Sequence, residues 1–175
     1  QAFRQAGINR LSMGVQSMHD EELRMLGRIH SHAQAVETFK AASEEGFGNI
    51  NIDLMSALPG QTFESWARTL EEAAAWGPEH ISAYSLIVEP GTPMAARVAS
   101  GAATVPDDDA VNAMQRQAVA RLEAAGYRVA ILSQPDYKSC DAFRESGKPR
   151  LGFLVTAGNI DSMVAHYTAA KKKRS

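Results

Sequence analysis

The segment 49–62, NINIDLMSALPGQT, constrains the fold more than any other part of the chain. Its first six residues alternate between polar and apolar side chains, and successive side chains of a β-strand point to opposite faces of the sheet. The polar positions are Asn49, Asn51 and Asp53, and the apolar positions are Ile50, Ile52 and Leu54. A buried parallel strand is normally apolar on both faces. One polar face therefore indicates an interior that a ligand can reach.

Strand-like runs alternate with helical patterns through the first 127 residues. Strands are expected at 10–16, 49–55 and 80–88, and helices at 19–45, in one or two pieces, and at 63–76. Thr62 is an N-cap residue before the second helix, and Gly46 and Gly77 are stop signals for the two helices. This alternation predicts right-handed βαβ units around a parallel sheet, which is an α/β fold.

The rest of the chain is also expected to have an α/β fold. A turn at 89–93 is followed by a stretch of small residues to position 105, and a helix is expected at 107–125. Beyond it, strands at 128–133 and 150–156 and helices at 139–146 and 159–170 predict a short Rossmann-like βαβα segment. No low-complexity linker separates the two parts.

Two polar residues on the predicted strands are candidates for ligand binding. Gln16 ends its strand at the carboxyl edge of the sheet, where parallel sheets carry their sites, and its amide can both donate and accept hydrogen bonds. Asp53 faces the same interior, where a carboxylate is costly unless it is paired or bound to a ligand. It could pair with Arg28. Gln16 could instead be satisfied by backbone groups, and Arg28 could be a solvated helix residue that bridges Glu21 or Glu22.

Three blocks in this region resemble a known family. GINRLSMGVQSMHDEELRMLGRIH, NINIDLMSALPGQTFESW and HISAYSLIVEPGTP follow one another as in the oxygen-independent coproporphyrinogen III oxidases and the related haem chaperones, which are radical SAM proteins. The EPGTP motif is more similar to the haem chaperones than to the oxidases. The resemblance spans residues 1–127 and implies the last three βα units of a partial (β/α)6 barrel. It also implies that Gln16, Arg28 and Asp53 contact S-adenosylmethionine.

The same family holds a [4Fe–4S] cluster with a CxxxCxxC loop, and this sequence contains no such spacing. In the family, the cluster cleaves S-adenosylmethionine to a deoxyadenosyl radical, which in the oxidases takes hydrogen from a porphyrinogen propionate. Without the cluster loop this chain is expected to be inactive in that chemistry. The chain starts at Gln1 in what resembles the end of a helix, which favours a fragment of a longer protein.

The composition excludes several other classes. A single cysteine, Cys140, rules out an internal disulfide framework and fits a reducing compartment, and neither a secretion signal nor an apolar run long enough for a membrane span is present. We therefore expect a cytoplasmic protein. The basic run at 171–174 could contact nucleic acid, but a basic run is also part of the second resemblance, so nucleic-acid binding is not expected.

That second resemblance covers residues 128–175. Within the segment GYRVAILSQPDYKSCDAFRESGKPRLGFLVTAGNIDSMVAHYTAAKKKRS, residues 128–175 are similar to the N-terminal domain of the YgiQ-type radical SAM proteins. Residues 1–127 are acidic and residues 128–175 are basic, which is typical of a join between unlike segments. Our hypothesis is a junction of two radical SAM gene pieces that meet near LEAAGYRV.

Two other interpretations stay open at this point. The chain could be a non-catalytic module that binds a nucleotide or corrinoid through residues 134–136 and 156–159. It could also have no function, because half of a barrel leaves two sheet edges unpaired and such edges promote aggregation.

Overall fold

The computed structural model describes residues 2–130, and residues 1–129 form one compact unit. The predicted βαβα segment, Cys140, the alternative binding residues at 134–136 and 156–159, and the basic run at 171–174 all lie outside the described residues. The candidate residues Gln16, Arg28 and Asp53 all lie in the unit of residues 1–129.

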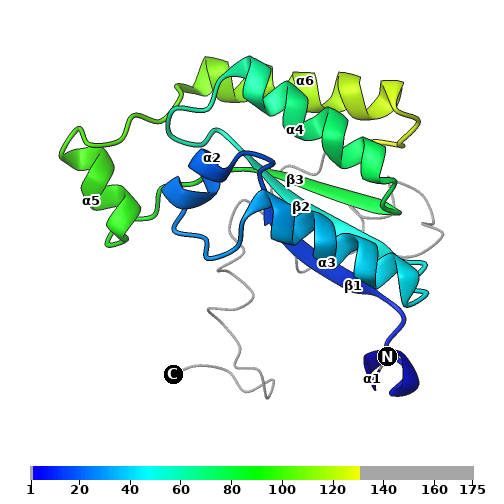
Figure 1. The fold of residues 1–175 in the computed structure, drawn as a ribbon. Helices are drawn as coiled ribbons and strands as arrows, with labels where there is room; N and C mark the ends of the chain where they lie inside the picture. The colour runs from blue at the N-terminus through cyan, green and yellow to red at the C-terminus, as the bar shows by residue number, and fades with distance from the viewer. Residues whose placement is uncertain (1, 131–175) are drawn as a thin grey trace, which may run out of the picture. The chain divides into compact units, whose positions relative to one another are not determined.

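A three-stranded parallel sheet is the centre of this unit (Figure 1). Its strands are β1 (Leu11–Gln16), β2 (Ile50–Ser56) and β3 (His80–Ser85), in the order β1-β2-β3. In the register, Ser12 lies beside Asn51, and Asp53 lies beside Ser82. The predicted α/β class and parallel sheet are confirmed. The predicted third strand was three residues too long, since β3 ends at Ser85.

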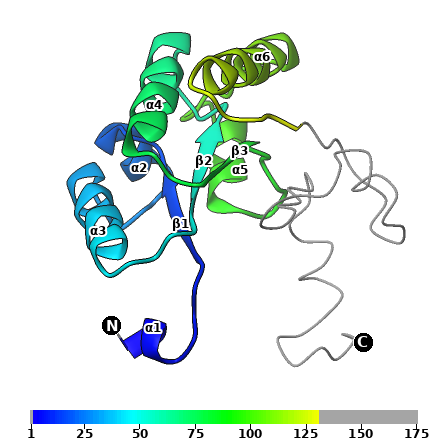
Figure 2. The ribbon, with the colours of Figure 1, turned by 90° about the vertical axis from the view of Figure 1, so that its right-hand side faces the viewer.

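Helices cover one face of the sheet (Figure 2). The described helices are α1 (Ala2–Gln5), α2 (Asp20–Met25), α3 (His32–Glu44), α4 (Phe63–Trp76), α5 (Pro93–Ala99) and α6 (Asp108–Ala124). Helix α4 begins at a capping box between Thr62 and Ser65 and ends at Gly77, as the sequence signals predicted. The indole of Trp66 donates a 3.0 Å hydrogen bond to the carbonyl of Met114, which ties α4 to α6. No helix of residues 2–130 is long and apolar enough to cross a membrane.

The apolar core lies between the sheet and helices α3, α4 and α6. Ile50, Ile52 and Leu54 are at most 2% exposed, and they contact the buried side chains of the helices. The period-two reading of β2 is therefore correct on this face: its apolar residues point to the helices and its polar residues point away from them. This arrangement leaves the other face of the sheet for polar side chains.

The region expected to be helical at 19–45, in one or two pieces, forms two helices. The chain passes through Gly27 at a φ of 69° and starts again at a capping box between Ser31 and Gln34. The structure differs from the prediction in the small-residue stretch, which contains α5 with Thr92 as N-cap and Pro93 in its first turn. This start carries an ordinary capping signal in the sequence, so α5 could have been predicted.

Candidate functional site

Asp53 is the centre of a hydrogen-bond network on the polar face of the sheet. Its Oδ1 atom accepts hydrogen bonds from the Tyr84 hydroxyl at 2.6 Å and from Asn51 Nδ2 at 2.7 Å. Its Oδ2 atom accepts one from the Ser12 hydroxyl at 3.2 Å. A carboxylate offers about four acceptor positions, so these three bonds leave one on Oδ2. The network thus fixes the carboxylate and keeps one acceptor position for a further donor.

Asn51 joins the three strands of this network. It is 0% exposed, its Nδ2 atom also donates to the Ser12 hydroxyl at 2.8 Å, and its Oδ1 atom accepts from the Ser82 hydroxyl at 2.8 Å. Burial raises the pKa of the Tyr84 phenol, and the hydrogen bond to Asp53 raises that pKa further. Tyr84 therefore stays protonated and donates to the carboxylate, because a neutral phenol is favoured beside a negative charge.

Gln16 lies at the carboxyl end of β1 in an unusual backbone conformation. The amide of Ser17 bonds to the carbonyl of Val15 at 2.9 Å, which closes a three-residue turn around Gln16 at a φ of 69°. This form of γ-turn is rare and strained, and residues held in such conformations often belong to functional sites. Gln16 is 7% exposed, and its Oε1 atom is buried without a hydrogen-bond partner. An unpaired buried acceptor of this kind is available to a ligand that donates.

A second buried carboxylate holds the turn that follows β1. Glu22 of α2 is 8% exposed and accepts hydrogen bonds from the Ser17 hydroxyl at 2.5 Å, from Gln61 Nε2 at 3.0 Å and from the Ser65 hydroxyl at 2.8 Å. Ser17 follows Gln16 directly, whereas Gln61 lies in the turn after β2 and Ser65 in the first turn of α4. Glu22 therefore fixes the carboxyl ends of β1 and β2 relative to each other.

Arg28 lies in the loop between α2 and α3, not on a helix as the sequence pattern suggested. Its side chain is exposed. Within residues 2–130 it pairs neither with Asp53 nor with Glu21 or Glu22, so both predicted pairings are wrong. The loop nevertheless lies at the carboxyl end of β1, because the His30 ring is hydrogen-bonded to the Val15 carbonyl at 3.3 Å.

The structure thus brings Gln16 and Asp53 to one face and leaves Arg28 in a loop beside it. Sequence reasoning did not single out Ser82 and Tyr84, although HISAYS alternates as β2 does and places them on the same face. Glu22 was considered only as a partner for Arg28. Its buried role depends on Gln61 and Ser65, which are distant in the sequence, so no local signal could have found it.

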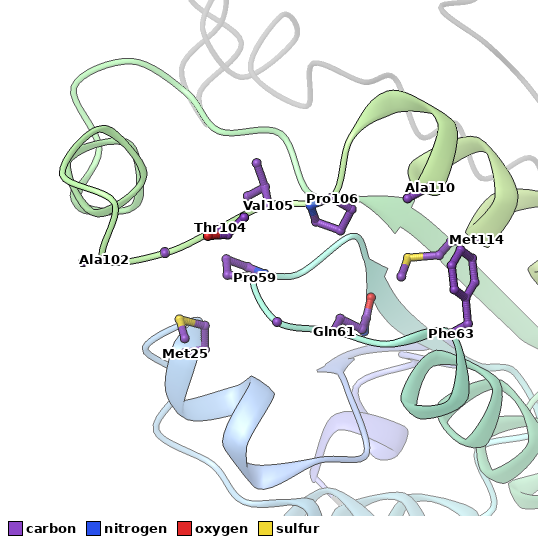
Figure 3. A pocket seen from close by; sticks show the side chains of 12 residues that line it. Met25, Pro59, Gln61, Phe63, Ala102, Thr104, Val105, Pro106, Ala110 and Met114 are labelled. Carbon is purple, nitrogen blue, oxygen red and sulfur yellow. The ribbon is translucent and has the colours of Figure 1, made fainter.

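A pocket of about 520 Å³ lies elsewhere on the unit (Figure 3). Its lining comes from the end of α2, the turn after β2, the segment before α6 and α6 itself, and includes Met25, Pro59, Phe63 and Met114. The pocket shares no residue with the Asp53 network. Its only amide side chain, Gln61, already donates to Glu22. Since specific sites combine an apolar cavity with several converging polar groups, the polar face is the stronger candidate.

Comparison with protein families gives two matches. Residues 1–73 match the family described as "Radical SAM superfamily", and residues 106–175 match the one described as "Radical SAM N-terminal". The first match contains Gln16, Arg28 and Asp53. The second overlaps α6 and continues through the residues outside the described part.

Individual relatives agree with the first match. The chain is 41% identical over 125 residues to "Radical S-adenosyl methionine domain-containing protein 1, mitochondrial" of Danio rerio, which covers 71% of this chain and 28% of that protein. It is 40% identical over 126 residues to "Heme chaperone HemW" of Escherichia coli, covering 72% and 32% respectively. The chain thus spans about a third or less of the length of these relatives.

A solved structure shows the same fold. Coproporphyrinogen III oxidase (HemN) from Escherichia coli, described as a radical SAM enzyme, superposes with a TM-score of 0.62 at 31% identity, over 72% of this chain and 29% of that one. The fold of this chain therefore agrees with that of the solved structure. This chain belongs to the radical SAM superfamily and is similar to the HemW haem chaperones and to coproporphyrinogen III oxidase.

Proposed function

We propose that the polar face of the sheet is part of a pocket for S-adenosylmethionine, to which Gln16, Arg28 and Asp53 contribute. The observation that carries the proposal is the buried, unpartnered Oε1 atom of Gln16 on the same face as a carboxylate with an acceptor position left. Both groups can accept hydrogen bonds from a ligand. S-adenosylmethionine offers ribose hydroxyls and an ammonium group, so these residues fit it.

Each residue has a distinct role in this proposal. Asp53 accepts a hydrogen bond from a ligand hydroxyl or ammonium group, while Tyr84 and Asn51 keep its carboxylate in place. Gln16 accepts a second hydrogen bond through Oε1. Arg28, exposed in its loop, supplies a cation for the ligand carboxylate. When bound in the superfamily's complete sites, S-adenosylmethionine supplies a carbon radical that abstracts hydrogen.

The residues of this chain do not fit an iron–sulfur cluster. Such clusters are normally held by several cysteine thiolates, whereas these 175 residues contain one cysteine. Residues 2–130 also contain no group of three His, Cys, Asp or Glu side chains that could hold a metal ion. We therefore propose that this chain binds the cofactor intact. Incubation with iron, sulfide and a reductant should release no deoxyadenosine, and its release would contradict the proposal.

The wider function is proposed from the relatives. HemW is named a haem chaperone and HemN a coproporphyrinogen III oxidase, so the substrate class we propose for the complete parent protein is a porphyrin or haem. We also propose that the barrel part ends near residue 127. The end of the first compact unit at residue 129 supports this boundary, and the contact between Trp66 and Met114 supports the inclusion of α6 in the barrel part. The YgiQ-like origin of residues 128–175 and the junction of two gene pieces are proposals of the same kind.

Titration of the 15N-labelled chain with S-adenosylmethionine tests the proposed site. Backbone signals of β1 and β2 should shift, and Asp53→Asn should weaken binding at least about tenfold, since a charge-assisted hydrogen bond contributes roughly 1.5–3 kcal/mol. Asp109→Asn is the matched control, because Asp109 is exposed at the start of α6. Equal binding by the two variants would contradict the site on the sheet. It would support the alternative nucleotide-binding module elsewhere in the chain.

A further inference from the structure

We propose that Gly14 is a positioning residue for Gln16: its missing Cβ atom makes the space in which the Gln16 amide lies. An ideal Cβ atom built on Gly14 would lie 2.8 Å from Nε2 of Gln16, closer than real Cβ atoms approach a heavy atom. The inference rests on the proposed function, because the ligand is the one proposed for Gln16. It assigns a role in binding to a residue that makes no polar contact with the ligand.

The backbone conformation does not explain a glycine at this position. Eight glycines of the described part have a positive φ, for which glycine is favoured, and Gly14 is not among them. Glycine in a strand interior also weakens the strand, so its presence indicates a close approach by another group. At Gly14 the approaching group is the Gln16 amide.

The strand register explains why this space matters for the site. Met13 pairs with Ile52 and Gln16 pairs with Leu54, so Gly14 and Val15 together lie opposite Asp53 alone. This bulge places Gly14 beside Asp53. The Gln16 side chain folds back over Gly14, and in our proposal this brings its amide beside the Asp53 carboxylate. A methyl group at position 14 would push the amide away from that position.

The chain after Gln16 cannot easily compensate for such a displacement. The γ-turn at Gln16 and the hydrogen bond from Ser17 to buried Glu22 fix the backbone on that side. The long, flexible side chain of Gln16 is therefore the part that moves. Since only the end of this side chain clashes with the added methyl group, we expect Gly14→Ala to keep the fold and to lose the amide position.

The test compares Gly14→Ala with Gly48→Ala in the full 175-residue chain. Gly48 also lacks a positive φ, and no heavy atom lies within 4 Å of its ideal Cβ position, so it is a matched control. Gly14→Ala should weaken S-adenosylmethionine binding about tenfold, as the loss of one buried hydrogen bond predicts, without lowering the thermal midpoint. Gly48→Ala should leave the affinity unchanged.

A double variant shows whether Gly14 acts through Gln16. In the Gln16→Ala background, adding Gly14→Ala should cause no further loss of affinity, because the displaced group is already gone. The side-chain amide signals of Gln16 in the 15N–1H spectrum should shift in Gly14→Ala but not in Gly48→Ala, with or without ligand. A further loss in the double variant, or unshifted amide signals in Gly14→Ala, would overturn the positioning role.

The outcomes also separate this inference from the proposed function. If the unsubstituted chain does not bind S-adenosylmethionine, the proposed function is wrong, and the role of Gly14 in binding falls with it. If the chain binds and Asp53→Asn weakens binding while Gly14→Ala does not, only the role of Gly14 is wrong.

Discussion

The two faces of β2 differ in what their side chains contribute. On the helix side, Ile50, Ile52 and Leu54 lose nearly all contact with water. On the other side, Asn51 is buried as completely, yet it takes part in a network of hydrogen bonds with Ser12, Asp53 and Ser82. One strand thus has an apolar face and a polar face, and side chains on both faces are buried from water.

The difference shows which face the fold needs for its stability. Burying apolar area stabilises a fold directly, whereas a buried polar group costs free energy unless it is hydrogen-bonded, and then it contributes little. An apolar face on both sides would serve stability better. The polar face therefore supports the proposed binding site, and substitutions on the two faces should separate stability from affinity.

Leu54→Ala should have the largest effect on stability. Leu54 is 0% exposed, and removing such a side chain leaves a cavity that costs about 2–5 kcal/mol. Urea unfolding measures this cost, and the fraction that remains folded should bind S-adenosylmethionine with unchanged affinity. Unchanged stability would show that the helix-covered face is not the main source of stability.

Asn51→Leu should lower both the stability of the fold and the affinity for S-adenosylmethionine. Leucine has a similar size but removes one hydrogen-bond partner each from Ser12, Ser82 and Asp53, which should cost about 1–3 kcal/mol by urea unfolding. Because Asp53 loses one of its supports, affinity for S-adenosylmethionine should also fall. A stabilised variant with normal affinity would mean that the network neither stabilises the fold nor supports ligand binding.

Tyr84→Phe should cost less, about 0.5–1.5 kcal/mol for one hydrogen bond. Its more specific effect concerns pH. Burial and Asp53 raise the pKa of Tyr84 above its value near 10 in the unfolded chain. Above about pH 10 the unfolded chain releases a proton that the folded chain keeps, so the free energy of unfolding falls as pH rises.

Unfolding series at increasing alkaline pH should show a shallower decline for Tyr84→Phe than for the unsubstituted chain. Part of the decline should remain, since burial and the nearby Glu79 also raise the pKa of Tyr127. An unchanged slope would show that Tyr84 is not held in its neutral form by the network.

His80→Gln should have the smallest effect. Burial and then the charge of Arg10 lower the pKa of His80 below 6.5, while Glu79 opposes them. Below about pH 6.5 the unfolded chain binds a proton that the folded chain resists, so stability falls as pH falls. The variant should lose a small part of this dependence between pH 6.5 and 5, measured by urea unfolding. A steeper dependence in the variant would contradict the lowered pKa.

Much of the fold could be predicted from local patterns. Alternation along β2 predicted both its position and its two faces, and the Thr62 and Gly77 signals predicted α4 with its observed ends. The prediction allowed two helices over 19–45, and the capping box at Ser31 marks where the second of them begins. Local chemistry therefore predicted elements well where start and stop signals were both considered.

The site was predicted less completely, because its contacts join distant parts of the sequence. Periodicity predicted that Gln16 and Asp53 share a face, but the bulge between Met13 and Gln16 and the positive φ of Gln16, which set the position of its amide, had no periodic signal. The bond from Tyr84 to Asp53 and the three bonds to Glu22 depend on strand order and loop packing. The γ-turn at Gln16 also had no signal, since glutamine rarely adopts a positive φ.

This turn has an evolutionary consequence. At position 16, glycine would adopt the observed φ of 69° without steric cost, whereas a side chain there costs roughly 1–3 kcal/mol. Selection for stability alone would favour glycine, so under the proposed function the glutamine at this position marks a trade-off between binding and stability. Searches for stabilising substitutions in this fold would therefore be drawn to position 16 and would remove the proposed ligand contact as they improved the scaffold.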